Sequence, residues 1–261
     1  MARRRTGEAA DVTPETHIPL SGSSPKHKIE ALQRRVVACT ACPRLIHYCR
    51  QVAQQKRRMY RDWEYWGKPL PSFGDPEAEL LLVGLAPAAH GGNRTGRMFT
   101  GDRSGDFLYR ALYEAGWANQ PVSRERNDGL VLRGCYITAA LRCAPPGNKP
   151  HPDELRRCRK WFEGELALLK QVRAVLALGK IAFDAYLTTV WGAGSFPPRG
   201  SLRFAHGASY PLPDGLPRLF ASYHPSQQNT QTGRLTPAMM AAVLSDIQRF
   251  LRGGNPGAEK M

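Results

Sequence analysis

The chain has 261 residues, of which 42% are apolar, and it carries a formal net charge of +15 at pH 7. This length suits one folded domain, and the chain has no apolar run of the roughly 18 residues that a transmembrane helix needs. The excess of Lys and Arg favours an anionic partner, with nucleic acid and an acidic membrane as candidates, and no basic amphipathic helix supports the membrane. Because the basic start of the chain lacks the apolar core of a secretory signal, we expect a cytoplasmic protein that associates with the nucleoid through DNA.

The two ends of the chain differ in composition from its middle. Residues 1–24 mix charged residues with Thr, Pro, Gly and Ser and show hardly any apolar periodicity. Such a segment buries too little apolar surface to offset the entropy of ordering, so we expect a disordered basic arm. We expect residues 25–252 to form a single α/β domain and residues 253–261 to form a flexible tail.

Apolar spacing in the middle of the chain predicts helices that alternate with strands. Helical patterns begin near residues 26, 45, 104, 152, 181 and 237. Apolar runs at residues 80–83, 134–143, 174–178 and 218–223 predict buried strands, and residues 191–213 predict a loop with a short hairpin. This order predicts a three-layer α/β/α sandwich around a central, four-stranded, mostly parallel sheet.

An aromatic segment lies between the second helix and the first strand. Tyr60, Trp63, Tyr65 and Trp66 precede a proline-rich stretch at residues 69–76. Such rings are able to stack on nucleic acid bases. Aromatic residues beside prolines more often pack onto the surface of their own domain, however, and we favour packing.

Residues 84–106 form a glycine-rich stretch between the first predicted strand and the following helix. The stretch therefore lies at the carboxyl end of a strand, where ligands bind in open α/β sheets. Its glycines let the backbone approach a ligand closely, and Arg94 and Arg97 add charge suited to phosphate. Loops of this length without structure of their own are uncommon unless they are functional, so we predict a ligand-binding loop.

Four cysteines form a candidate metal site. Cys39 and Cys42 form a C-x-x-C pair, and Cys143 and Cys158 flank a proline-rich loop far along the chain. Four thiolates suffice to hold either a [4Fe-4S] cluster or zinc, and the alternative is that the two distant cysteines are ordinary core residues. The two other cysteines, Cys49 and Cys135, are assigned to structure, because Cys49 has no close cysteine partner and Cys135 lies within an apolar strand.

Four motifs occur in order along the chain, at residues 84–90, 97–102, 142–150 and 224–229. Together with the four cysteines they resemble the uracil-DNA glycosylase superfamily, and more narrowly its family 5, the B-type enzymes with an iron-sulfur cluster. The resemblance implies a monofunctional DNA glycosylase that flips a damaged base out of the helix and hydrolyses its glycosidic bond, leaving an abasic site. It also implies that Cys39, Cys42, Cys143 and Cys158 hold a [4Fe-4S] cluster with a structural role.

The resemblance assigns chemistry to individual residues. Cleavage of the bond builds negative charge on the base, and His224 matches the motif position that donates a hydrogen bond near base oxygen O2. Phe99 is placed to stack on the flipped base. Other branches carry an acidic or amide residue where this chain has Leu85, so Asp102 is the candidate replacement carboxylate. A purely structural role for Asp102, as the N-cap of the next helix, is an equal alternative.

The candidate substrate-binding residues lie in the same motifs and are Gly84, Ala86, Ala88, His90, Asn93, Phe99, Asn148, Ser226, Asn229 and Arg234. Related enzymes read the uracil edge with an asparagine where this chain has Ala139, and Asn148 or Asn93 is a partial substitute. Loss of that amide implies a broader set of bases that includes hypoxanthine, xanthine and ethenocytosine. Polar Gln227 and Gln228 stand where relatives carry an apolar wedge, so we expect distortion of the duplex to depend either on Arg234 or on these amides filling the gap.

We therefore expect a monomer that acts on double- and single-stranded DNA containing damaged bases. The competing class is a non-catalytic iron-sulfur or zinc protein that binds DNA through its basic surface. Leu85 favours that class, because an expected catalytic side chain is missing there.

Overall fold

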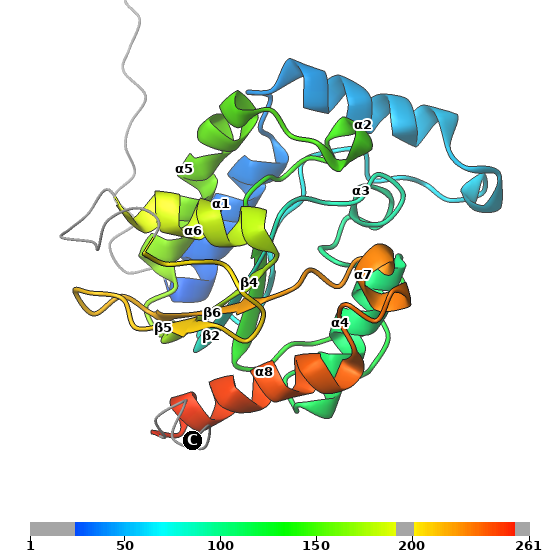
Figure 1. Ribbon diagram of the computed structural model, residues 1–261. Helices are drawn as coiled ribbons and strands as arrows, with labels where there is room; N and C mark the ends of the chain where they lie inside the picture. Colours follow the sequence, from blue (N-terminus) through cyan, green and yellow to red (C-terminus); the bar gives the residue numbers. More distant parts are fainter. Residues whose placement is uncertain (1–23, 192–200, 254–261) are drawn as a thin grey trace, which may run out of the picture.

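The computed structural model describes residues 24–191 and 201–253 (Figure 1). The expected basic arm, apart from Ser24, and the expected tail, apart from Gly253, lie outside the described residues. Part of the predicted hairpin loop, residues 192–200, also lies outside them. Within the part of the chain that the structure describes, no helix is both long enough and apolar enough to cross a membrane.

A six-stranded sheet forms the centre of the fold, with strand order β1-β3-β2-β4-β6-β5. Its four central, mutually parallel strands are β2 (Leu80–Gly84), β3 (Cys135–Ala139), β4 (Ala174–Leu178) and β6 (Arg218–Ser222). These are the four strands that the apolar runs predict. The two antiparallel edge strands are β1 (Phe73–Gly74) and β5 (Ser209–Tyr210). The prediction of a four-stranded sheet is thus corrected to six strands, because two-residue strands are too short to show a periodic pattern.

Eight α-helices and two short 3-10 helices surround the sheet in the described residues. The α-helices are α1 (Pro25–Val37), α2 (Pro43–Gln55), α3 (Gly92–Thr95), α4 (Arg103–Glu114), α5 (Pro152–Leu168), α6 (Lys180–Val190), α7 (Gln227–Gln231) and α8 (Pro237–Leu251). The 3-10 helices are η1 (Arg58–Tyr60) and η2 (Pro146–Asn148). Prolines open α1, α2, α5 and α8, where the missing N–H removes no hydrogen bond of the helix.

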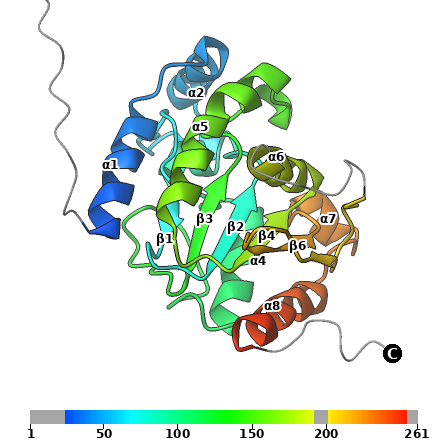
Figure 2. The same ribbon diagram turned by 90° about the vertical axis from the view of Figure 1, so that its left-hand side faces the viewer.

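The helices cover both faces of the sheet, which gives the predicted three layers (Figure 1, Figure 2). One face packs against α4 and α8, and the other against α1, α5 and α6. Alternate residues of β2 serve the two cores, because Leu80 and Leu82 face one layer while Leu81 and Val83 face the other. All five residues of β2 are buried, as expected for a parallel strand covered on both sides.

A third apolar cluster joins α1, α2 and α5 to the segment that follows β3. Its fully buried members include Val36, Leu45, Cys49, Leu141 and Ala144. The cluster holds α2 beyond the layered body of the protein, next to α3. It also brings the cysteines at residues 39–49 toward those at residues 143 and 158.

The carboxyl ends of the four parallel strands meet at one edge of the sheet. Gly84 ends β2, Ala139 ends β3, and Gly179 and Tyr223 directly follow β4 and β6. The loops that leave these positions therefore converge, and three of the four resemblance motifs begin there.

Candidate active site

The glycine-rich loop after β2 is a folded unit held by Arg94. The guanidinium of Arg94 donates from Nε to the His90 carbonyl and from Nη2 to the Gly101 carbonyl, each at 2.8 Å. It also lies between the rings of Tyr60 and Trp63, at 3.9 and 4.1 Å from their centroids. Arg94 is buried, so it braces the loop from within. Tyr60 and Trp63 pack on the protein, which agrees with the interpretation of these aromatics as packing residues.

Arg97 is also internal. Its side chain is 2% exposed and pairs with Asp128 at 2.7 Å, and it donates a further hydrogen bond of 2.7 Å to Ser123. The prediction that Arg94 and Arg97 supply charge for phosphate is therefore wrong. Both guanidinium groups satisfy acceptors of the protein itself, which a sequence cannot reveal for acceptors as distant as Asp128.

Phe99 and His224 come together from separate loops. Their ring centroids are 5.8 Å apart, with an angle of 31° between the planes. Phe99 has a φ of +50°, an unfavourable region for a bulky residue and one that occurs at functional sites. Gly84 lies against the ring, because a Cβ at this position would be 2.9 Å from it. The three residues thus form one wall of a candidate base-binding site at the carboxyl edge.

His224 directly follows Tyr223 at the end of β6, and its surroundings fix both its position and its charge. The side-chain amide of Asn229 donates to the His224 carbonyl at 2.8 Å, and a Cβ on Gly179 would lie 3.2 Å from that of His224. Burial lowers the pKa of His224 to about 4. The ring is therefore neutral at pH 7 and carries one N–H donor.

Asp102 is the N-cap of α4. Its Oδ1 accepts a hydrogen bond of 3.0 Å from the backbone N–H of Gly105. Burial raises the pKa of Asp102 above its ordinary value, against the opposing effects of the Gly105 and Ser104 N–H groups and of Arg94. The other oxygen, Oδ2, faces Gly91, where an added Cβ would lie only 2.1 Å away. The capping role is thus confirmed, and it uses the Oδ1 oxygen of the carboxylate.

The remaining candidate residues in the glycine-rich loop differ in how far they are exposed to solvent. Ala86 and Ala88 are half-buried, and His90 places Nδ1 3.1 Å from the Tyr65 hydroxyl. Asn93 is fully buried and its amide donates to the Cys49 carbonyl at 3.2 Å. Asn93 therefore supports the loop from within through its amide N–H groups, while its Oδ1 is buried without a hydrogen-bond partner.

The candidates in the other two motifs lie on short helices. Asn148 is exposed on η2, with a φ of +58°. Ser226 caps α7 by accepting from the Asn229 N–H at 3.3 Å, and the Arg234 guanidinium lies 4.6 Å from the centroid of the Tyr223 ring. The wedge segment expected after His224 is thus part of a helix, and it exposes Gln227 and Gln228.

The four predicted ligand cysteines gather at the third apolar cluster. Cys42, Cys143 and Cys158 are buried, Cys39 is half-buried, and all are free thiols. Burial raises the pKa of Cys158 to about 11, with Arg142 acting against this effect and the charges of Cys39 and Cys42 adding to it. Burial raises the pKa of Cys42 as well, while a hydrogen bond from Arg157 lowers it. In the described ranges no group of three or more His, Cys, Asp or Glu side chains has the geometry to hold a metal ion.

The fold gives Cys49 a cysteine neighbour that the sequence does not show. The sequence gives it no cysteine nearby, but the fold places it against Cys143, whose hydrogen bond lowers the pKa of Cys49. The Cys49 thiol also donates to the Ala144 carbonyl at 3.7 Å. Cys135 lies inside β3 as predicted, and burial raises the pKa of its thiol. The thiol cluster accordingly contains five cysteines, not four.

A buried polar network beneath the cysteine cluster was not anticipated. Arg142 pairs with Glu165 and donates to Ser72. Glu165 also accepts from Thr138 at 2.6 Å and from Gln33 at 2.7 Å. Helical spacing could have indicated that Glu165 is buried. It follows the core residue Phe162 by three positions and therefore lies on the buried face of α5.

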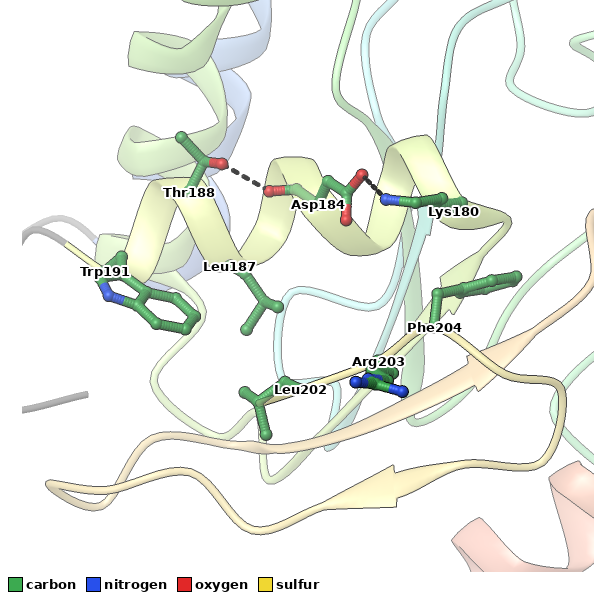
Figure 3. A pocket seen from close by; sticks show the side chains of 8 residues that line it. All are labelled: Lys180, Asp184, Leu187, Thr188, Trp191, Leu202, Arg203 and Phe204. Carbon is green, nitrogen blue, oxygen red and sulfur yellow. Dashed lines mark hydrogen bonds and ion pairs between the residues drawn. The ribbon is translucent and has the colours of Figure 1, made fainter. Parts of the chain in front are cut away.

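A cavity of about 470 Å³ lies elsewhere, between α6 and the segment that leads to β5 (Figure 3). The described residues that line it are Lys180, Asp184, Leu187, Thr188, Trp191, Leu202, Arg203 and Phe204. Lys180 is paired with Asp184 at 2.5 Å, and Thr188 donates to the Asp184 carbonyl at 2.7 Å. None of these lining residues belongs to the predicted site, so the candidate site remains at Phe99 and His224.

Comparison with known proteins agrees with the motifs. The family model described as "Uracil DNA glycosylase superfamily" matches residues 71–248. A protein of Thermus thermophilus named "Type-5 uracil-DNA glycosylase" is 53% identical over 221 residues, which cover 85% of this chain and 97% of that protein. Proteins with the same name from Mycobacterium leprae and Pyrobaculum aerophilum are 48% and 44% identical, covering 85% of this chain and 95% and 92% of their own lengths. The chain belongs to the uracil-DNA glycosylase superfamily.

Proposed function

We propose that the protein is a monofunctional DNA glycosylase that hydrolyses the N-glycosidic bond of uracil in DNA and leaves an abasic site. The observation that carries the proposal is the pairing of Phe99 with a neutral His224, 5.8 Å apart at the carboxyl edge of the sheet. Membership of the superfamily and the type-5 name of three relatives support it. The competing class of non-catalytic DNA-binding protein has only Leu85 in its favour.

The chemistry divides between the base and the sugar. Breaking the bond leaves negative charge on the base, and the neutral His224 ring donates its N–H to base oxygen O2 as that charge develops. A ring with a pKa of about 4 is uncharged at neutral pH, so the site needs no proton from solution to be ready. Phe99 holds the flipped base by stacking against its face.

Asp102 acts on the sugar. Its carboxylate stabilises the positive charge that develops there or positions the attacking water. Burial raises the pKa of Asp102, and the N–H groups of Gly105 and Ser104 oppose this effect by stabilising the carboxylate. Capping of α4 fixes Oδ1 and so orients the whole carboxylate.

The residues available to read the edge of a base support a broad set of substrates. Ala139, buried at the end of β3, offers no amide to read a base edge, and the Asn93 amide is engaged with backbone carbonyls. Asn148 is exposed and is the remaining candidate for such a contact. We therefore include hypoxanthine, xanthine and ethenocytosine among the substrates, together with uracil, in both double- and single-stranded DNA.

This proposal predicts abasic products from each of the four bases. Purified protein is incubated with oligonucleotides that carry one modified base, in single- and double-stranded form, and abasic sites are cleaved with alkali. Strand breaks at uracil and at the three other bases support the full proposal. Breaks at uracil alone restrict it to uracil, and intact strands throughout contradict it.

The four cysteines Cys39, Cys42, Cys143 and Cys158 would hold a [4Fe-4S] cluster. The fit rests on the donor set, since these four thiols are close enough to perturb one another's pKa values and thiolates are the ligands of such clusters. Bound by these residues, such a cluster would cross-link the start of α2, the segment after β3 and α5. The protein is proposed to act as a monomer.

Gly91 provides a test of the Asp102 position. In Gly91→Ala the new methyl group would overlap Oδ2 of Asp102, so the carboxylate must move. We expect uracil excision to slow by about 100-fold, the usual cost of misplacing a catalytic group by about 1 Å. Gly164→Ala, in α5, is the control, because there the added methyl meets only the flexible Leu32 side chain at 3.3 Å. Equal rates for Gly91→Ala and wild type, measured in single turnover, would exclude Asp102 from the reaction.

A further inference from the structure

A short projection follows α2 and comprises residues 56–63. Helix α2 ends at Gln55 because Lys56 turns to a φ of +42°, and Lys56 Nζ then donates to the Arg61 carbonyl at 3.2 Å, which closes the turn. Figure 1 shows this turn in light blue beyond the end of α2, on the side of the molecule where α3 and α7 lie. The projection is therefore a compact turn that extends from the face of the candidate site.

The projection has an apolar tip surrounded by positive charge. Met59 is 71% exposed, more than any other large hydrophobic side chain in the described residues. Arg57, Arg58 and Arg61 are all exposed beside it, and Arg61 pairs with the exposed Asp62 at 3.8 Å, which leaves Arg57 and Arg58 as the excess positive charge. A single exposed methionine needs no explanation by itself, but one set among three arginines matches a surface that meets a polyanion with an apolar interior.

The base of the projection is joined to the catalytic loop. Tyr60 and Trp63 hold the Arg94 guanidinium between their rings, and the same group donates to the carbonyl of Gly101, which precedes Asp102. The projection also affects the loop electrostatically. Burial lowers the pKa of His90, and the positive charge of Arg57 in the projection lowers it further. Met59 is thus carried on a turn that is linked through Arg94 to the loop that holds Asp102.

A duplex whose base has been flipped out needs its stack held open. DNA-binding proteins do this with Met, Leu, Ile, Phe or Pro side chains pressed between base steps. The helix after His224 presents Gln227 and Gln228 at its start, and both are polar. Met59 is the exposed apolar side chain that the projection offers.

We propose that Met59 is a wedge that enters duplex DNA beside the flipped base, while Arg57 and Arg58 contact the flanking phosphates. The partner is double-stranded DNA, and the inference rests on the proposed function. A wedge contributes only where a base must leave a stacked, paired helix. Its effect is accordingly confined to duplex substrates.

The test compares Met59→Ala with wild type on uracil in a duplex and on the same strand alone. We expect the rate on duplex DNA to fall by about tenfold and the rate on the single strand to stay within about twofold. Val131→Ala is the matched control, since Val131 is a 48% exposed apolar residue on another loop. Met59→Leu is expected to restore duplex activity because leucine keeps an apolar side chain of similar volume.

A fluorescence measurement reports the wedge independently of turnover. A duplex with 2-aminopurine beside a non-hydrolysable 2′-fluoro-uridine is titrated with each protein, and wild type is expected to raise the emission more than Met59→Ala does. Equal loss of activity on duplex and single strand, or no loss on either, would overturn the role of Met59. If wild type fails on the single strand and the duplex alike, the proposed glycosylase function itself fails.

Discussion

Replacing His224 with alanine is expected to lower the single-turnover rate of uracil excision by about 100- to 1,000-fold, the usual cost of removing one donor to a developing negative charge. The reason is geometric, because His224 lies beside the Phe99 ring at the end of β6. Substrate binding, measured with an uncleavable duplex, should change far less than the rate. An unchanged rate would assign the donor to another group.

The pH profile separates His224 from Asp102. An ordinary histidine would titrate near pH 6.5, but His224, with its pKa of about 4, stays neutral as the pH rises from 5 to 8. The proposed role of Asp102 requires the ionised form, and burial raises its pKa. Activity should therefore fall as the pH falls toward and below that raised value. His224→Ala should keep this acid limb, whereas Asp102→Asn should lose it along with most of the rate.

Replacing Cys158 with alanine is expected to remove the cluster. The variant should lose its absorbance near 400 nm and most of the roughly four irons per chain of a [4Fe-4S] protein, measured after anaerobic purification. Its unfolding temperature should also fall, because α5 would no longer be cross-linked to α2 and to the segment after β3. Zinc found in the wild type in place of iron would contradict the choice of cluster but retain the four ligands.

Two further cysteines are controls for this experiment. Cys135→Ala removes an equally buried thiol from β3, away from the thiol cluster, and should keep both iron and colour. Cys49→Ala is more informative, because Cys49 touches Cys143. Retention of iron in Cys49→Ala supports the four proposed ligands. Its loss would bring Cys49 into the ligand set.

The central strands and most helices could be predicted because burial leaves a pattern in the sequence. The run Leu80–Gly84 is apolar throughout because helices cover both faces of β2, and Met240 and Ile247 mark the buried face of α8. The edge strand β1 has two residues and shows no such pattern. Helix α7 is likewise invisible to apolar periodicity, since residues 227–231 are all polar.

The site could be predicted in part, because Phe99 and His224 belong to loops at the same edge of a parallel sheet. The superfamily is confirmed by the comparisons. The roles of Arg94 and Arg97 were wrong, since whether a loop arginine faces solvent or an internal acceptor depends on tertiary contacts such as Asp128. The same limit applies to Asn93, whose amide is used by the carbonyls of Cys49 and Ala89.

The three glycines Gly84, Gly91 and Gly179 each lie where an added methyl group would press on a residue of the site. The affected side chains are those of Phe99, Asp102 and His224, so main chain forms the wall behind every proposed functional group. The site consequently has no side chains there that could be trimmed to enlarge it. Engineering toward bulkier bases has to begin at positions with side chains to exchange, such as Ala139 and Asn148, and has to leave the three glycines unchanged.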